Sequence, residues 1–125
     1  MQIHESGEDY LETILMLQKR LGVVRSIDIV REMNFSKPTV SIAMKRFREN
    51  GYIQMDADGY ITLTEKGAQI AERIYERHLV IAAVLMALGV EETTAYQDAC
   101  RIEHDLSEDS FQCIKEHYQK NRKSE

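Results

Sequence analysis

Residues 26–63 read SIDIVREMNFSKPTVSIAMKRFRENGYIQMDADGYITL, and this stretch decides the fold. Residues 26–33 place Ile, Val and Met at helical spacing behind Ser26, a good capping residue, so they predict a short helix. Asn34 tolerates a left-handed backbone and predicts a sharp turn. A second helix then begins at residue 36 or 37 and runs to residue 50, with Pro38 in its first turn, where a missing amide hydrogen costs little. Two helices joined in this way indicate a helix-turn-helix.

A small hairpin follows the second helix at once. Residues 52–55 and 60–63 are short apolar-rich segments, and Asp56 to Gly59 between them supply turn chemistry. A helix-turn-helix followed by one hairpin is the order of a winged-helix DNA-binding domain. The predicted fold class is therefore mainly α, with a small β-hairpin as the wing.

Helical patterns flank this core on both sides. Ser6 is expected to cap the first helix, Thr64 to open the longest one, and Ser107 to cap the last. We expect helices over residues 6–20, 64–88, 91–105 and 107–119, followed by a frayed tail at 120–125. The predicted organisation is a DNA-binding domain at residues 1–66 and a second, helical domain at residues 67–125, whose expected roles in metal binding and dimerisation depend on the residues described below.

Composition bounds the class of protein. The chain has 125 residues with one Pro, six Gly and 43% hydrophobic residues, which suits a helical globular protein. Two cysteines are too few for a secreted disulfide framework, and the first nine residues lack the pattern of a signal peptide. The longest apolar run, residues 79–90, has twelve residues, whereas a membrane helix needs about twenty. We therefore expect a cytoplasmic protein without a membrane partner, and Cys113 is expected to pack inside the last helix's interface.

Charge is distributed unevenly along the chain. The net charge is −5, yet residues 18–51 hold eight basic and three acidic residues. Local positive charge is what binds phosphate, so this segment predicts contact with double-stranded DNA. The residues expected at base edges and phosphates are Lys37, Pro38, Thr39, Ser41, Lys45, Arg46 and Arg48.

The long helix predicts a partner subunit. Residues 79–88 leave almost no polar face over three turns, and a small monomer could not easily cover them. A two-fold homodimer would present two recognition helices to successive major grooves, which favours a pseudo-palindromic operator.

The segment Cys100-Arg101-Ile102-Glu103-His104 carries metal-ligand chemistry. Positions 100, 103 and 104 are spaced so that a thiol, a carboxylate and an imidazole share one helix face. Asp9 with Glu12 on the first helix, or His78 on the long helix, could complete the coordination. This mixture of donors suits Fe(II), Mn(II), Co(II) or Zn(II) better than Ca(II) or Mg(II).

Five segments of the chain match one family in order: EDYLE at 8–12, PTVS at 38–41, LTEKG at 63–67, RH at 77–78 and CRIEHDLS at 100–107. Together they resemble the diphtheria-toxin-repressor family, most of all its two-domain manganese transport regulators. The likeness covers nearly the whole chain, and it implies a homodimeric, metal-activated regulator of metal-transport genes.

The resemblance implies a ligand set. Asp9, Glu12, His78, Glu103 and His104 match ligand positions of the manganese branch. Cys100 departs from that branch, which usually has a bridging Glu there, and agrees with the iron branch. We therefore expect Fe(II) or Mn(II) as the physiological metal, with Zn(II) or Co(II) able to bind in vitro, and no small organic ligand.

Two other classes of protein share some of these features with a metal-dependent regulator. A winged-helix thiol sensor would oxidise Cys100 and use the acids structurally. A carboxylate-histidine di-metal enzyme would usually need a Glu-x-x-His on each of two helices, and this chain has no such pair. The sequence therefore predicts a regulator of the repressing kind and not an enzyme.

Overall fold

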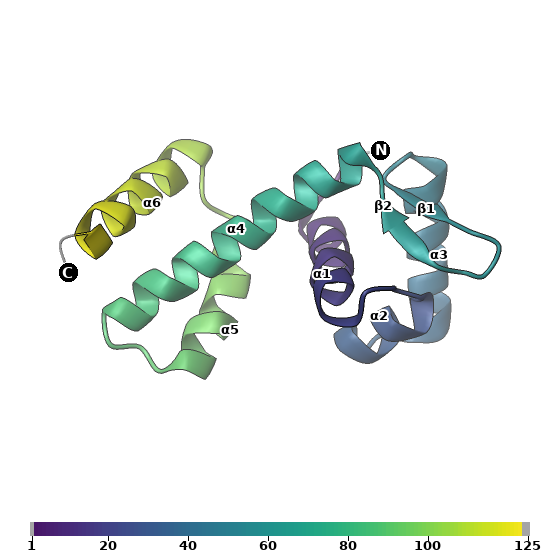
Figure 1. The fold of residues 1–125 in the computed structure, drawn as a ribbon, viewed down its shortest axis with the longest axis horizontal. Coiled ribbons are helices and arrows are strands. Elements are labelled where there is room, and N and C mark those ends of the chain that lie inside the picture. Colours follow the sequence, from purple (N-terminus) through teal and green to yellow (C-terminus); the bar gives the residue numbers. More distant parts are fainter. Residues whose placement is uncertain (1, 124–125) are drawn as a thin grey trace. The chain divides into compact units, whose positions relative to one another are not determined.

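The structure is a computed structural model that describes residues 2–123. Two compact units divide the chain between Arg73 and Ile74, which we call the N-terminal and C-terminal units. The described residues form mainly helices, with one two-stranded sheet in the N-terminal unit (Figure 1). The predicted mainly α fold class is confirmed.

Helix α1 spans Glu5–Leu21 and supplies the largest part of the N-terminal core. Its N-cap is His4, in an extended conformation, so the predicted Ser6 cap was wrong by two residues. The helix ends at Gly22, which has a φ of 87° and donates its N–H to the Gln18 carbonyl. The buried apolar side chains of the helix follow its 3.6-residue period at Tyr10, Leu11, Ile14, Leu15 and Leu17.

Helices α2 (Ser26–Met33) and α3 (Lys37–Glu49) form the predicted helix-turn-helix. Asn34 between them has a φ of 56° and a ψ of 41°, the expected left-handed conformation. Ser36 caps α3 by accepting a hydrogen bond from the Thr39 N–H at 3.2 Å. Ser26 is the first residue of α2 and not its cap. The Asp28 carboxylate accepts the N–H of Arg25 at 2.9 Å instead and stabilises that helix start.

One face of α3 is buried against the rest of the unit. Val40, Met44 and Phe47 are each 2% exposed or less. The Phe47 ring makes edge-to-face contacts with Tyr10 on α1 and with Tyr52, at centroid distances of 5.8 and 6.2 Å. Such pairs contribute about 0.5–1.5 kcal/mol each beyond burial. They fix α3 against α1 and leave its other face open.

The wing is an antiparallel pair of β1 (Ile53–Met55) and β2 (Ile61–Leu63), in which Ile53 pairs with Leu63. The Asp56 carboxylate accepts the N–H groups of Asp58 and Tyr60, both at 2.9 Å. These bonds close the predicted turn.

Helix α4 (Glu65–Ala87) begins directly after the wing. The Thr64 hydroxyl accepts the Gly67 N–H at 3.2 Å and donates to the Gly51 carbonyl at 2.7 Å. A Cβ atom at Gly67 would lie 2.1 Å from the carbonyl oxygen of Tyr52. The first turn of α4 therefore approaches the chain before β1 so closely that only glycine fits.

In the C-terminal unit, α4 continues beside α5 (Glu92–Ile102) and α6 (Glu108–Lys123). Ile81 and Ala82 of α4 pack with Ala99 of α5 in a small core. Ser107 caps α6 as predicted, since its hydroxyl accepts the Ser110 N–H at 3.1 Å. Leu79 of α4 and Leu88 in the turn after α4 are 42% and 77% exposed, which agrees with the expected apolar surface.

Three predictions for this unit were wrong. Helix α5 ends at Ile102, about three residues before the predicted end. Helix α6 continues to Lys123 where a frayed tail was expected from residue 120, and residues 124–125 lie outside the described part. Cys113 is exposed and not packed. Within residues 2–123, no helix is both long enough and apolar enough to serve as a membrane span.

Candidate metal centre and nucleic-acid interface

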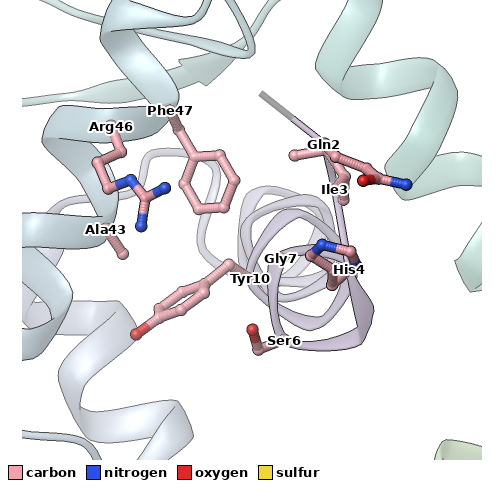
Figure 2. Close-up of a pocket in the computed structure, with 9 residues that line it drawn as sticks. All are labelled: Gln2, Ile3, His4, Ser6, Gly7, Tyr10, Ala43, Arg46 and Phe47. Atoms are coloured by element: carbon pink, nitrogen blue, oxygen red, sulfur yellow. The ribbon is translucent and has the colours of Figure 1, made fainter.

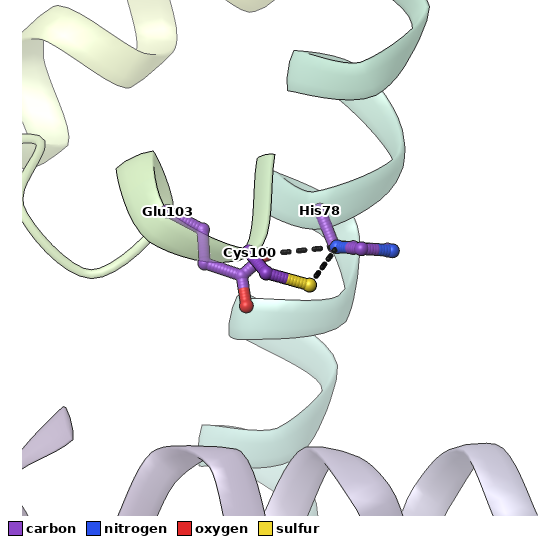
Figure 3. A group of neighbouring side chains, drawn as sticks. All are labelled: His78, Cys100 and Glu103. Carbon is purple, nitrogen blue, oxygen red and sulfur yellow. Dashed lines mark hydrogen bonds and ion pairs between the residues drawn. The ribbon is translucent and has the colours of Figure 1, made fainter. Parts of the chain in front are cut away.

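Three of the predicted ligands converge in the C-terminal unit. His78 comes from α4, Cys100 from the last turn of α5, and Glu103 is the C-cap residue of α5. His78 Nδ1 lies 3.0 Å from Glu103 Oε2 and 3.7 Å from Cys100 Sγ, as the dashed lines in Figure 3 mark. One ligand atom from each residue lies within 4.8 Å of the others.

The three groups differ in exposure and in charge. Glu103 is fully buried, His78 is 7% exposed and Cys100 is exposed. Hydrogen bonds that the imidazole donates to Cys100 and, second in effect, to Glu103 raise the pKa of His78 to about 10, against the opposing effect of burial. Without an ion the imidazole is therefore protonated at neutral pH. Its positive charge offsets the negative charge of the buried Glu103 carboxylate.

Arg77, next to His78, holds the segment that carries Glu103. Its Nη1 donates to the backbone carbonyls of Glu103 at 3.0 Å and Leu106 at 2.7 Å, and Nη2 pairs with the Glu108 carboxylate at 2.9 Å. In the sequence, Arg77 stands out only as part of the RH segment at 77–78 that resembles the family. Its clamping role depends on contacts 26 to 31 residues away along the chain, which local pattern does not reveal.

The donor set fits a first-row transition ion. Ligand atoms that each lie about 2.0–2.3 Å from one ion are at most about 4.6 Å apart, and the distances from His78 Nδ1 to its two neighbours lie well inside that limit. Thiolate and imidazole exclude a site built for Ca(II) or Mg(II). Three atoms leave such an ion short of the four to six ligands it prefers, so further donors are needed.

The remaining predicted ligands are Asp9, Glu12 and His104. Asp9 and Glu12 lie on α1 in the N-terminal unit, one turn apart, so their carboxylates share a helix face. His104 lies in the turn after α5, with Nε2 3.5 Å from Glu103 Oε1. The prediction that residues 100, 103 and 104 share one helix face was wrong for His104, because α5 ends at Ile102.

The predicted DNA-contact residues lie on the open side of the helix-turn-helix. Each of the seven is exposed, whereas Val40, Met44 and Phe47 of α3 face the core. Four of the seven are cationic, and none of the first-turn residues of α3 is acidic. The residues are Lys37, Pro38, Thr39, Ser41, Lys45, Arg46 and Arg48.

Two neighbouring hollows run along this open side. One, of about 380 Å³, lies where the start of α2 meets Lys37, and the other, of about 240 Å³, extends to Arg48 and Met55 at the wing. They share Ser26 and Ser41. The surface beside α3 is thus concave between the start of α2 and the wing.

A further cavity of about 160 Å³ lies where α3 meets the beginning of α1. In Figure 2, Ala43, Arg46 and Phe47 of α3 form one side of it, and residues at and before the first turns of α1 form the other. Arg46 is exposed at its edge. Its guanidinium is therefore accessible to a phosphate group.

Two protein-family models match successive parts of the chain. Residues 2–61 match the family model described as iron dependent repressor, N-terminal DNA binding domain. Residues 64–124 match the model described as iron dependent repressor, metal binding and dimerisation domain. The two matches together span nearly the whole chain.

Individual relatives agree with these models. An uncharacterized HTH-type transcriptional regulator of Methanocaldococcus jannaschii is 33% identical over 113 residues, covering 89% of this chain and 90% of that protein. The transcriptional regulator MntR of Escherichia coli is 32% identical over 108 residues, covering 86% of this chain and 70% of that protein.

Solved structures share the fold. The manganese regulator SloR is similar with a TM-score of 0.78 and 26% identity, over 95% of this chain and 55% of that one. A manganese-dependent transcriptional repressor in complex with manganese is similar with a TM-score of 0.77 and 25% identity, over 86% of this chain and 50% of that one. The chain therefore spans about half the length of these solved regulators.

Proposed function

The chain belongs to the iron-dependent repressor family of metal-dependent, DNA-binding transcriptional regulators, and from this premise we propose how its own residues act. The family consists of regulators and not of enzymes, in agreement with the sequence prediction. We propose repression of genes for metal-ion uptake or homeostasis. Residues 1–66 would bind DNA, and residues 67–125 would bind metal and dimerise. The cytoplasm is the proposed compartment, because the operator lies there.

One observation carries the proposal: His78, Cys100 and Glu103 bring three ligand atoms together around the buried carboxylate of Glu103. A buried carboxylate needs a compensating positive charge. In the absence of a metal, protonated His78 supplies that charge. A divalent ion would supply it instead, so His78 would release its proton and bind through the freed nitrogen.

We propose that Asp9, Glu12 and His104 complete the coordination. For Asp9 and Glu12 the support is their spacing on α1 and the family resemblance, and for His104 it is the contact with Glu103. Because α1 belongs to the DNA-binding domain, carboxylates on it that bind the same ion as His78 would tie that domain to the dimerisation domain. Fe(II) and Mn(II) are the proposed metals, and Zn(II) and Co(II) are expected to bind in vitro.

The exposed cationic face of α3 is the proposed reading surface. Lys37, Thr39 and Ser41 at its start would meet base edges or nearby phosphates, while Lys45, Arg46 and Arg48 would bind the backbone. A homodimer would place two such helices one helical turn of DNA apart and select a pseudo-palindromic operator. The exposed side chains of Leu79 and Leu88 support burial against a second copy of the chain.

Anaerobic titration of the metal-free protein with Fe(II), Mn(II) and Zn(II) tests this function, with stoichiometry and affinity read together. We expect saturable binding that is lost in Glu103→Gln. The matched control is Glu116→Gln, which changes an exposed carboxylate on α6 of the same unit, outside the ligand cluster and the contacts of Arg77. Equal binding by the wild type and Glu103→Gln would remove the site from the proposal.

A thiol sensor is the second candidate, because the exposed Cys100 thiol lies beside protonated His78. An exposed thiol is accessible to an oxidant. A sensor of this kind would lose DNA binding on peroxide treatment in metal-free buffer, and Cys100→Ser would abolish that response. A metal-dependent regulator would show no DNA binding to lose under those conditions.

A further inference from the structure

The face of α3 that points away from the core has a large apolar side chain near its centre. Ile42 is 62% exposed, the most exposed large hydrophobic side chain of the N-terminal unit among the described residues. It lies two positions from both Val40 and Met44, which are buried. At about 100° per residue this places Ile42 about 160° around the helix axis from each of them.

The surroundings of Ile42 are polar and cationic. Lys45 and Arg46 lie three and four positions further along α3, so they border Ile42 on the same helix face, and both are exposed. Thr39 lies three positions before it and is exposed as well. An isolated apolar side chain among exposed cations suits a partner that offers an apolar group between two rows of negatively charged groups.

Double-stranded DNA offers such a group in its major groove. The C5-methyl of thymine is the apolar feature of the base edges there, and the other edge groups are hydrogen-bond donors and acceptors. Ile42 has no donor or acceptor of its own. Against a cytosine or guanine edge it would remove water from polar groups without replacing their hydrogen bonds, which is unfavourable.

We propose that Ile42 is a specificity-determining residue that selects thymine by contact with its 5-methyl group. This inference rests on the proposed DNA-binding function and adds a base preference to it. The neighbouring hydroxyl and cationic side chains would fix the register of α3 on the backbone. Ile42 would then set the identity of one base pair in each half-site.

The test begins with selection of duplexes from a random-sequence library by the full chain in Mn(II) or Fe(II). Each thymine of the enriched duplex is then replaced singly by deoxyuridine, which lacks only the 5-methyl group. We expect one thymine per half-site at which the replacement weakens wild-type binding about fourfold, the equivalent of one buried methyl group. At that position Ile42→Ala should bind the thymine and deoxyuridine duplexes equally.

Val23→Ala is the matched control, since Val23 is 56% exposed and lies outside α3. It should keep the wild-type thymine preference. If the wild type enriches a consensus but no thymine depends on its methyl group, or if the dependence persists in Ile42→Ala, the role of Ile42 is overturned while DNA binding stands. If the wild type enriches no duplex with any metal, the DNA-binding function itself fails, and the inference falls with it.

Discussion

Arg77 donates from Nη1 to the backbone carbonyl of Glu103 at 3.0 Å, although the two residues are 26 positions apart. The same atom donates to the Leu106 carbonyl at 2.7 Å. A single buried guanidinium thus fixes the segment after α5, which carries the central carboxylate of the candidate metal centre. This segment is not helical, so the clamp replaces the support that a helix would give.

Arg77→Met should therefore weaken metal binding without unfolding the chain. Loss of an outer hydrogen bond to a ligand typically costs 10–100-fold in metal affinity. Titration with Mn(II) or Fe(II) measures the change, and circular dichroism checks the helix content. Arg101→Met is the control, since Arg101 is exposed and pairs only loosely with Asp98 at 3.7 Å. Unchanged affinity in Arg77→Met would show that the clamp does not position Glu103.

The ion pair around His78 makes the stability of the metal-free protein depend on pH. The pKa of His78 is raised to about 10 by Cys100 and Glu103 from an ordinary value of 6.5. Because the folded state holds the His78 proton more tightly than the unfolded state, protonation of His78 stabilises the fold. This contribution is fully present below pH 6.5 and disappears as the pH rises through about 10.

Thermal unfolding of the metal-free chain between pH 6.5 and pH 10 measures this effect. The midpoint of the wild type should fall across this interval more steeply than that of His78→Gln, which has no imidazole to titrate. Parallel curves for the two proteins would contradict the assignment of a protonated His78.

Gly67→Ala should destabilise the N-terminal unit. The added Cβ would lie 2.1 Å from the Tyr52 carbonyl oxygen, so either α4 or the chain before β1 must move. Overpacking of this kind costs about 1–3 kcal/mol, and denaturant unfolding measures it. Gly7→Ala is the control on α1, because the atoms nearest to its Cβ would be side-chain atoms of Ile3 at 3.2 Å and of Phe47 at 3.7 Å. An equal or smaller loss in Gly67→Ala would contradict the close approach.

Arg46→Ala should weaken binding to all DNA sequences to a similar extent. Arg46 is exposed at the end of α3 that faces α1, and a phosphate contact carries no base information. The slope of log affinity against log salt should decrease by about one unit. Arg73→Ala is a control cation, since Arg73 pairs with Glu8 within the same unit. An unaltered slope in Arg46→Ala would place Arg46 outside the interface.

Local chemistry made much of the N-terminal unit predictable. The Asn34 turn, the Ser36 cap and the Asp56 turn each depend on residues fewer than five positions apart, and each is present. The cluster of His78 with Cys100 and Glu103 could be anticipated only through helix-face spacing combined with a family resemblance, because α4 and α5 must pack together to form it.

Features that depend on tertiary contact could not be predicted. The end of α5 at Ile102 coincides with the bonds that Arg77 makes to the following segment. The exposure of Cys113 depends on which face of α6 packs against the core. Phe111 lies on the packed face and is buried, whereas Cys113 is exposed. In α6, helix continues through Lys120 although no apolar periodicity demands it.

The most direct test of the proposed metal-dependent DNA binding is to measure the affinity for a labelled duplex by fluorescence anisotropy. It compares the wild type with Glu103→Gln, each with metal present and absent. Coupling of about 1–3 kcal/mol between two sites changes affinity about 5–150-fold. We expect Mn(II) or Fe(II) to tighten wild-type binding by a factor in that range and to leave Glu103→Gln unchanged, with the same dimer in both. An equal metal response in the two proteins would contradict the switch at this site.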